Sequence, residues 1–272
     1  MSDVPILQVA ELVKIYGGRR GPRGGGLVAV DDVSFTLESR GCLAVVGESG
    51  SGKTTTARII AGLEQASSGR VSVDGQPWNI GRLTTRERRR RARVVQMVFQ
   101  DPYQSLDRRQ TVGACLHETL RLHFDLSSAE RASRVAELLE LVGLTADHAR
   151  VRPRMLSGGQ RQRVAIARAL APQPRLLILD EAVAALDVSI QAQILNLLTD
   201  AREKTGVAML FISHDLGVVR QVADSVVVMK DGHVVEHGPA DRIFGKPEHA
   251  YTQRLLNSTP RPGWRPVARA AT

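Results

Sequence analysis

The chain has 272 residues with a formal net charge of +9, and 43% of its residues are hydrophobic. This composition is typical of a globular protein with a sizeable core, and no apolar run approaches the roughly 20 residues of a membrane helix. The two cysteines, Cys42 and Cys115, lie far apart and support neither a disulfide framework nor a zinc or iron–sulfur site.

The N-terminus lacks the charged and apolar regions of a signal peptide, so we expect the chain to stay in the cytoplasm. Its positive charge could favour binding to nucleic acid or to an anionic membrane surface, or it could simply form a solvated basic face. The arginine clusters lack the interleaved aromatic residues that single-strand binders use for stacking. A solvated face is therefore the default interpretation, and membrane proximity is the second.

The first 46 residues predict strands. Residues 6–15 alternate roughly between apolar and polar, which indicates an edge strand, and residues 27–37 resume the alternation. Together they predict an antiparallel β subdomain. Residues 42–46 form an apolar run suited to a buried strand. Tyr16, between the first two strands, either stacks on a purine ring or ends a strand in the core.

The stretch from Gly47 to Thr55 fits the phosphate-binding loop pattern G-x-x-x-x-G-K-[ST] at every fixed position. Glycines let backbone N–H groups converge on a polyphosphate, and Lys53 adds a positive charge. Thr54 offers a hydroxyl to Mg²⁺, and a helix from Thr55 to about residue 61 presents its positive end. The expected nucleotide contacts are Gly47, Ser49, Gly50, Gly52, Lys53, Thr54 and Thr55.

A helical region follows the loop after two further strands. Residues 67–76 predict a strand and turn, residues 86–93 a charged helix, and residues 94–99 a strand ending at Gln100. Helices are then expected at 111–122 and 128–142, the second with capping residues at its start and Gly143 at its end. This helical insert is expected to form a lobe of its own.

Ser157 is a good N-cap for a helix that runs to about residue 171. Gly158 and Gly159 directly after it allow close backbone approach at a second potential anion site. Residues 176–181 predict a buried strand ending in Asp180, which can hold Mg²⁺ through water, and Glu181, which can accept a proton from water. Such carboxylate pairs also cap strands without any catalytic role.

The last part of the chain contains two further strand regions. Residues 209–215 predict a buried strand with His214 near its end, where a lone histidine is usually a surface or capping residue. Residues 226–235 predict a hairpin with an Asp-Gly turn. Beyond residue 238 we expect a short helical and loop tail, with residues 260–272 poorly ordered.

Taken together and in this order, the phosphate loop, Gln100, Leu156 to Gln160, Asp180-Glu181, Leu186-Asp187 and His214 resemble the ATP-binding subunit of an ABC transporter. The resemblance covers residues 6 to about 240. It implies an α/β P-loop NTPase core with a mixed, largely parallel sheet, an antiparallel β subdomain, and a helical subdomain at about 101–157. The expected division is an ATPase domain over 1–240 and a tail over 241–272.

The resemblance also implies roles for individual residues. Tyr16 would stack on adenine, and Gln100 would sense Mg²⁺ and the attacking water while touching a membrane partner. Glu181 would act as general base, and His214 would contact the γ-phosphate. The roles that involve a second ATPase chain fall to Ser157 and Gly159, which would serve its ATP, and to Asp187, which would cross the interface.

A narrower resemblance, to the oligopeptide, dipeptide and nickel importer branch, comes from residues 100–106, 187–195 and the tail from Pro247 to Leu256. Ala250 replaces the usual proline of the tail pattern, and residues 182–184 depart from the common Pro-Thr-Ser. The branch implies two permeases, a second and different ATPase chain, an external solute-binding protein, and a peripheral position on the cytoplasmic membrane face.

Three alternative functions compete with peptide import. One is import of nickel or another small solute within the same branch. Another is a soluble ATPase acting on DNA or ribosomes, which the charge of +9 favours but which typically needs a coiled-coil insertion, zinc cysteines or tandem ATPase domains. The third is a subunit that binds ATP without hydrolysing it, which would require loss of Glu181 or His214. We therefore expect an ATPase of a peptide importer that uses ATP and Mg²⁺ and binds no nucleic acid.

Overall fold

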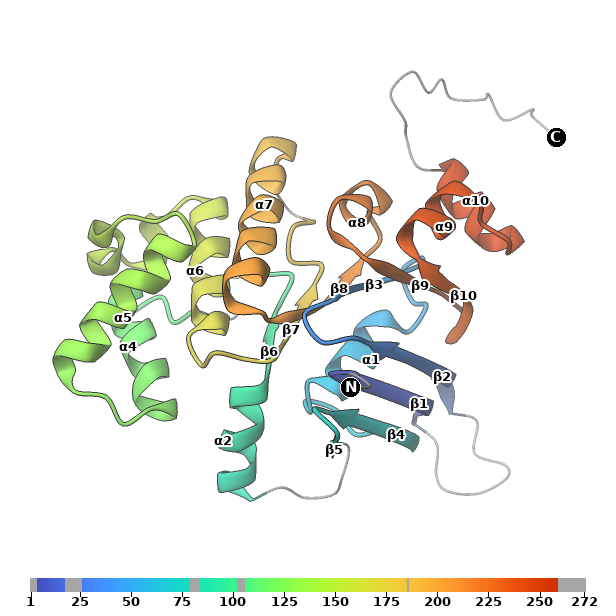
Figure 1. Ribbon diagram of the computed structural model, residues 1–272, viewed down its shortest axis with the longest axis horizontal. Coiled ribbons are helices and arrows are strands. Elements are labelled where there is room, and N and C mark those ends of the chain that lie inside the picture. The colour runs from blue at the N-terminus through green and yellow to red at the C-terminus, as the bar shows by residue number, and fades with distance from the viewer. Residues whose placement is uncertain (1–3, 18–25, 79–83, 102–105, 185, 259–272) are drawn as a thin grey trace.

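The computed structural model describes residues 4–17, 26–78, 84–101, 106–184 and 186–258. In Figure 1 the strands lie at the centre and right, with a group of helices at the left. The strands are β1 (Leu7–Tyr16), β2 (Leu27–Leu37), β3 (Cys42–Val46), β4 (Ser68–Val73), β5 (Gln76–Pro77), β6 (Val95–Val98), β7 (Leu176–Asp180), β8 (Ala208–Ser213), β9 (Ser225–Lys230) and β10 (His233–Pro239). The helices are α1 (Lys53–Ile60), α2 (Thr85–Val94), α4 (Val112–His123), α5 (Ser128–Leu141), α6 (Gly158–Leu170), α7 (Val188–Thr205), α8 (Leu216–Val222), α9 (Ala240–Gly245) and α10 (Ala250–Ser258), with short 3₁₀ helices at Ala146–Arg150 and Pro153–Met155.

The larger sheet has the strand order β10-β9-β3-β8-β7-β6. All neighbouring pairs are parallel except β9 with β10. Strands β3, β7 and β8 are buried along their whole length, since helices or the other sheet cover both faces. Because parallel strands share a direction, the carboxyl ends of β3, β6, β7 and β8 meet at one edge. This confirms the predicted mixed, largely parallel α/β core.

A smaller antiparallel sheet with the order β2-β1-β4-β5 packs against one side of this core. Its apolar residues share a cluster with Leu43 and Val45 of β3 and with Ile59 and Ile60 of α1. The predicted antiparallel β subdomain is confirmed, but the prediction that residues 6–15 form an edge strand is wrong. In β1, Leu7 pairs with Leu37 on one side and with Val73 on the other. Alternation reveals which face of a strand is buried, not how many neighbouring strands it has.

The helical lobe is built from α4 and α5, which contact each other and α6. Thr111 caps α4 by accepting a hydrogen bond from the Ala114 N–H, and Ser127 caps α5 in a reciprocal pair with Glu130. Gly143 follows α5 with a φ of +65°, which favours glycine and ends the helix. The predicted helical insert is confirmed at both of its main helices.

Several boundaries differ from the sequence prediction. Helix α1 begins at Lys53 rather than at Thr55, and α7, an 18-residue helix, was not predicted at all. The hairpin of β9 and β10 turns at Asp231 and Gly232, both with positive φ, as an Asp-Gly turn requires. The expectation for residues 260–272 lies outside the described residues. In the described ranges, no helix combines the length and apolar character needed to cross a bilayer.

Candidate functional site

The phosphate loop connects β3 to α1, and its glycines are required by the surrounding backbone. A Cβ on Gly47 would lie 2.1 Å from the carbonyl oxygen of Met229, and one on Gly52 would lie 2.4 Å from that of Ala29. Gly50 has open space around it but a φ of +83°. The loop is thus tightly fixed at both ends and unobstructed in the middle, where Ser49 and Gly50 are exposed.

Lys53 is buried at the start of α1, and its ammonium group is held by the loop itself. The Nζ atom donates to the carbonyl oxygens of Gly47 at 2.8 Å and Glu48 at 2.7 Å, and to the hydroxyl of Ser51 at 3.3 Å. Burial lowers the pKa of Lys53, while the negative charges of Glu181 and Asp180 oppose this effect. The site therefore holds a cation against two backbone oxygens and one hydroxyl, near two carboxylates.

Asp180 at the end of β7 lies beside the first turn of α1. Its Oδ1 accepts a hydrogen bond from the hydroxyl of Thr54 at 3.1 Å. Burial raises the pKa of Asp180, and the hydrogen bond from Thr54 opposes that rise. The structure therefore brings two of the three residues predicted to serve the metal, Thr54 and Asp180, into direct contact, from positions 126 residues apart.

The side chain of Glu181 contacts Gln100, which follows β6, and His214, which follows β8. Its Oε2 accepts a hydrogen bond from Nε2 of Gln100 at 3.0 Å, and its Oε1 lies 3.1 Å from Nδ1 of His214. Glu181 has a φ of +48°, a left-handed conformation that side chains rarely adopt and that is enriched at functional sites. All three predicted catalytic residues thus meet at the carboxyl edge of the parallel strands.

Tyr16 lies at the end of β1, next to α1. Its hydroxyl is 3.5 Å from Oγ1 of Thr55, and the ammonium of Lys14 lies 4.8 Å from the centroid of its ring. The side chain is partly exposed, so of the two alternatives the position at the surface beside the phosphate loop is the observed one, not a core position.

Ser157, Gly159 and Asp187 form a second group. Ser157 caps α6 in a reciprocal pair with Gln160, and Asp187 precedes α7 with an exposed side chain that makes no capping hydrogen bond. Within the described ranges, these three residues make no hydrogen bond to the phosphate loop. One chain therefore brings together the predicted residues that follow β6, β7 and β8, whereas Ser157, Gly159 and Asp187 are not hydrogen-bonded to the phosphate loop.

The two glycines of α6 have different surroundings. A Cβ on Gly159 would lie 2.5 Å from Cγ2 of Ile190 in α7, whereas the nearest atom to a Cβ on Gly158 would be 3.8 Å away. The close approach at Gly159 is therefore made to a side chain of the same molecule.

Gly159→Ala is expected to reduce the free energy of unfolding relative to Gly158→Ala. Overpacking against Ile190 costs about 1–3 kcal/mol. The gain in helix propensity, at most about 1 kcal/mol, is common to both variants and cancels in the comparison. Thermal and denaturant unfolding of the two variants measures the difference. Equal stability would mean that α7 yields to the added methyl group.

One residue at the site was missed by the sequence analysis. The hydroxyl of Tyr251 in α10 accepts a hydrogen bond from the Glu48 N–H in the phosphate loop at 3.1 Å. Its signal in the sequence is the tail pattern from Pro247 to Leu256, which indicates the importer branch but no role for Tyr251.

Two known protein families match parts of the chain. Residues 30–184 match a family described as "ABC transporter", and residues 235–270 match one described as "Oligopeptide/dipeptide transporter, C-terminal region". The chain is 46% identical over 257 residues to the di/tripeptide transport ATP-binding protein DppF of Pseudomonas aeruginosa, covering 94% of this chain and 79% of that protein. It is 50% identical over 265 residues to the probable peptide ABC transporter ATP-binding protein y4tS of Sinorhizobium fredii, covering 96% and 74%.

Solved structures of the same family are also similar to this chain. A dimeric post-hydrolysis state of the ATP-binding cassette MJ0796, bound to ADP and phosphate, aligns with a TM-score of 0.75 and 30% identity, covering 86% of this chain and 98% of the other. The cbiO1 protein of Clostridium perfringens aligns with a TM-score of 0.77 and 28% identity, covering 89% and 91%. The chain therefore belongs to the ABC transporter family, as one of its ATP-binding and ATP-hydrolysing subunits.

Proposed function

We propose that this chain hydrolyses ATP to energise the import of oligopeptides or dipeptides through a pair of membrane permeases. The observation that carries the proposal is that one chain combines the contacts of Gln100 and His214 with Glu181, beside the phosphate loop, with a C-terminal segment of the oligopeptide/dipeptide transporter type. The named peptide and di/tripeptide relatives support the same solute class.

The nucleotide contacts are assigned to the phosphate loop and its neighbours. The free N–H groups of the loop and the N-terminus of α1 bind the phosphates, and Lys53 turns from its carbonyl partners toward them. The exposed ring of Tyr16 offers a surface on which adenine stacks. Ser49, Thr54 and Thr55 complete the contacts that we assign to this chain.

The residues next to the phosphate loop fit Mg²⁺, which prefers hard oxygen donors. They are the hydroxyl of Thr54, the carboxylate of Asp180 and the amide oxygen of Gln100, and the first two already touch. When bound, the ion neutralises charge on the phosphate oxygens during phosphoryl transfer.

Hydrolysis is assigned to Glu181 as general base. The hydrogen bond from Gln100 and the contact with His214 involve different oxygens of its carboxylate and orient it, so that an oxygen can accept a proton from an attacking water. His214 is the residue that we assign to the γ-phosphate. A fixed base and fixed donors need no rearrangement during the reaction, which is how preorganised sites lower a barrier.

We further assign Ser157, Gly159 and Asp187 to the ATP site of a second ABC ATPase chain, which we expect to be a different polypeptide. Ser157 and Gly159 lie at the N-terminus of α6, where free N–H groups attract anions. In the solved dimeric structure of the cassette MJ0796, two such chains pair, which supports an arrangement of this kind. Closure on ATP and opening after hydrolysis would then shift the permeases between two states.

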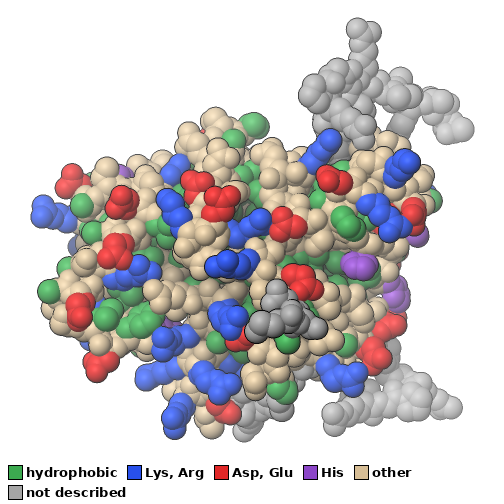
Figure 2. Space-filling model, viewed as in Figure 1, with side chains coloured by type: hydrophobic (Ala, Val, Ile, Leu, Met, Phe, Trp, Pro, Cys, Tyr) green, Lys and Arg blue, Asp and Glu red, His purple; other side chains and the backbone are tan. Residues whose placement is uncertain are grey.

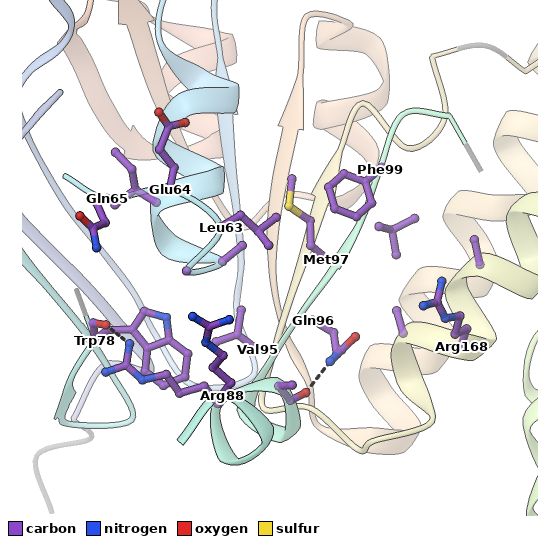
Figure 3. Close-up of a pocket in the computed structure, with 18 of the residues that line it drawn as sticks. Leu63, Glu64, Gln65, Trp78, Arg88, Val95, Gln96, Met97, Phe99 and Arg168 are labelled. Carbon is purple, nitrogen blue, oxygen red and sulfur yellow. Dashed lines mark hydrogen bonds between the residues drawn. The ribbon is translucent and has the colours of Figure 1, made fainter. Parts of the chain in front are cut away.

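A cavity next to Gln100 is the surface that we assign to a permease. Its volume is about 830 Å³, and it lies between the turn after α1, the strand β6 and the helices α2 and α6 (Figure 3). Leu63, Met97 and Phe99 contribute apolar surface, and Leu63 is 61% exposed. Because Phe99 directly precedes Gln100, an occupant of the cavity would sense changes at the ATP site.

The surroundings of the cavity are basic. Lys and Arg side chains gather over α2 at the lower edge of the face shown in Figure 2, and Arg91 packs over the Trp78 ring at 4.6 Å. This charge suits a position close to an anionic membrane surface, which supports a peripheral location at the cytoplasmic face of the membrane.

Co-purification of the tagged chain from its native membrane tests the proposal. We expect to recover two permeases and a second ATPase chain, together with a peptide-binding protein. The variant Leu63→Glu is expected to lose the permeases. Val4→Glu is the matched control, since Val4 is 65% exposed and does not line the cavity. Recovery with ribosomes or DNA would overturn the transport proposal, and nickel-binding partners would overturn the peptide assignment.

A further inference from the structure

The tail after β10 is fixed to the rest of the protein at its turn. The carboxylate of Glu236 in β10 accepts two backbone hydrogen bonds, from the Glu248 N–H at 2.8 Å and from the His249 N–H at 3.1 Å. Nδ1 of His249 accepts from the Tyr251 N–H at 3.1 Å, and the amide of Gln253 donates to the Pro247 carbonyl at 2.9 Å. These bonds set both the position and the direction of α10.

Tyr251 is the residue through which α10 reaches the phosphate loop. Its side chain is 4% exposed, and the ammonium of Lys230 lies 5.4 Å from its ring centroid. Its hydroxyl accepts the hydrogen bond from the Glu48 N–H. Burial raises the pKa of Tyr251, so the hydroxyl stays neutral at physiological pH. A buried side chain in a fixed position is thus in contact with a loop that must bind a polyanion.

The position of this hydrogen bond matters because of the peptide unit that it engages. The N–H of Glu48 and the carbonyl of Gly47 belong to the same planar peptide group. Tyr251 holds the N–H end at 3.1 Å, and Lys53 holds the carbonyl end at 2.8 Å. The backbone carbonyl of Met229 packs so close to Gly47 that residue 47 has no room for a Cβ. The first peptide of the loop is therefore clamped from three sides.

We propose that Tyr251 is a positioning residue for ATP binding, and that the segment from Pro247 to Ser258 acts as a brace for the phosphate loop. When Lys53 leaves the Gly47 carbonyl for the phosphates, the bond from Tyr251 remains and keeps the first peptide in place. Preorganisation of this kind raises affinity, because binding then orders fewer groups. The proposal rests on the nucleotide site assigned above.

The test is the change Tyr251→Phe, which removes the hydroxyl and keeps the ring. The dissociation constant of the full-length chain for magnesium and a non-hydrolysable ATP analogue is measured by calorimetry. We expect about fivefold to tenfold weaker binding, the effect of one hydrogen bond to a group left without its partner. In turnover assays KM should rise by a similar factor with kcat little changed, since Glu181 and its partners are untouched.

The control is Ile243→Val in α9, outside the proposed brace. Ile243 is 2% exposed and packs in the same core, so removal of one methyl group is expected to lower Tm without altering nucleotide affinity. Wild-type affinity in Tyr251→Phe, or an equal loss in Ile243→Val, would overturn the proposal. Failure of the unaltered chain to bind the analogue would overturn the nucleotide site as well, which separates the two conclusions.

A double-mutant cycle tests the brace as a unit. Glu236→Ala removes the acceptor of both turn N–H groups, so α10 should loosen and nucleotide affinity should fall. If the effect passes through the hydroxyl of Tyr251, Glu236→Ala should add little in the Tyr251→Phe background. Equal losses in both backgrounds would show that Tyr251 is not the link.

Discussion

Glu181→Gln is expected to lower ATP turnover by about 10²–10⁴-fold while ATP still binds. The amide cannot accept a proton from water, yet it has nearly the same shape and can keep contacts with Gln100 and His214. Because ATP then persists at the site, the dimer with the second ATPase chain should be stabilised. Phosphate release and size-exclusion chromatography of the ATP-loaded complex measure the two effects.

The matched control is Glu203→Gln, the same chemical change at an exposed position of α7. Turnover and dimer lifetime in this variant should equal those of the unaltered chain. Normal phosphate release in Glu181→Gln would contradict the assignment of Glu181 as general base, and loss of ATP binding would mean that the carboxylate serves the nucleotide rather than the water.

Lys53→Ala is expected to weaken ATP binding by about 100-fold or more. The phosphates lose a charged hydrogen-bond donor in a buried position, which corresponds to about 3 kcal/mol. The ligand-free loop is affected too, because the carbonyls of Gly47 and Glu48 lose their shared donor. Calorimetric titration with the magnesium complex of an ATP analogue measures the affinity, and Tm without nucleotide reports on the loop.

Lys204→Ala, in an exposed part of the last turn of α7, removes the same charge far from the loop. If both variants lose affinity equally, the effect is one of overall charge rather than of direct contact. Unchanged affinity in Lys53→Ala alone would contradict the assignment of the loop as the phosphate site.

The sequence predicted the local features of the fold because they depend on neighbouring residues. The glycine pattern of the phosphate loop, the caps at Ser127 and Ser157 and the Asp-Gly turn of the hairpin all act within a few residues. Helix α7 was missed because its first six residues, 188–193, are all at least partly exposed: Ile194 is its first fully buried residue, so the apolar pattern begins late.

The position of β1 shows the limit of such local patterns. Alternation correctly predicted that residues 6–15 form a strand, but β4, the partner on its second side, comes more than 50 residues later. A strand's neighbours depend on how the whole chain is routed, and the periodicity of one segment carries no information on that.

By itself the sequence determined the chemistry of this protein: which residues can bind phosphate, hold a hard cation and accept a proton, and that these stand at strand ends and a helix start. The tertiary structure alone decided which of them meet. It joined Gln100, Glu181 and His214 through parallel strands with a common carboxyl edge. Within the described residues, it makes no hydrogen bond between that group and Ser157 or Asp187. It also brought Tyr251 to a loop 203 residues earlier in the chain, because packing against the core, not sequence proximity, sets where α10 lies.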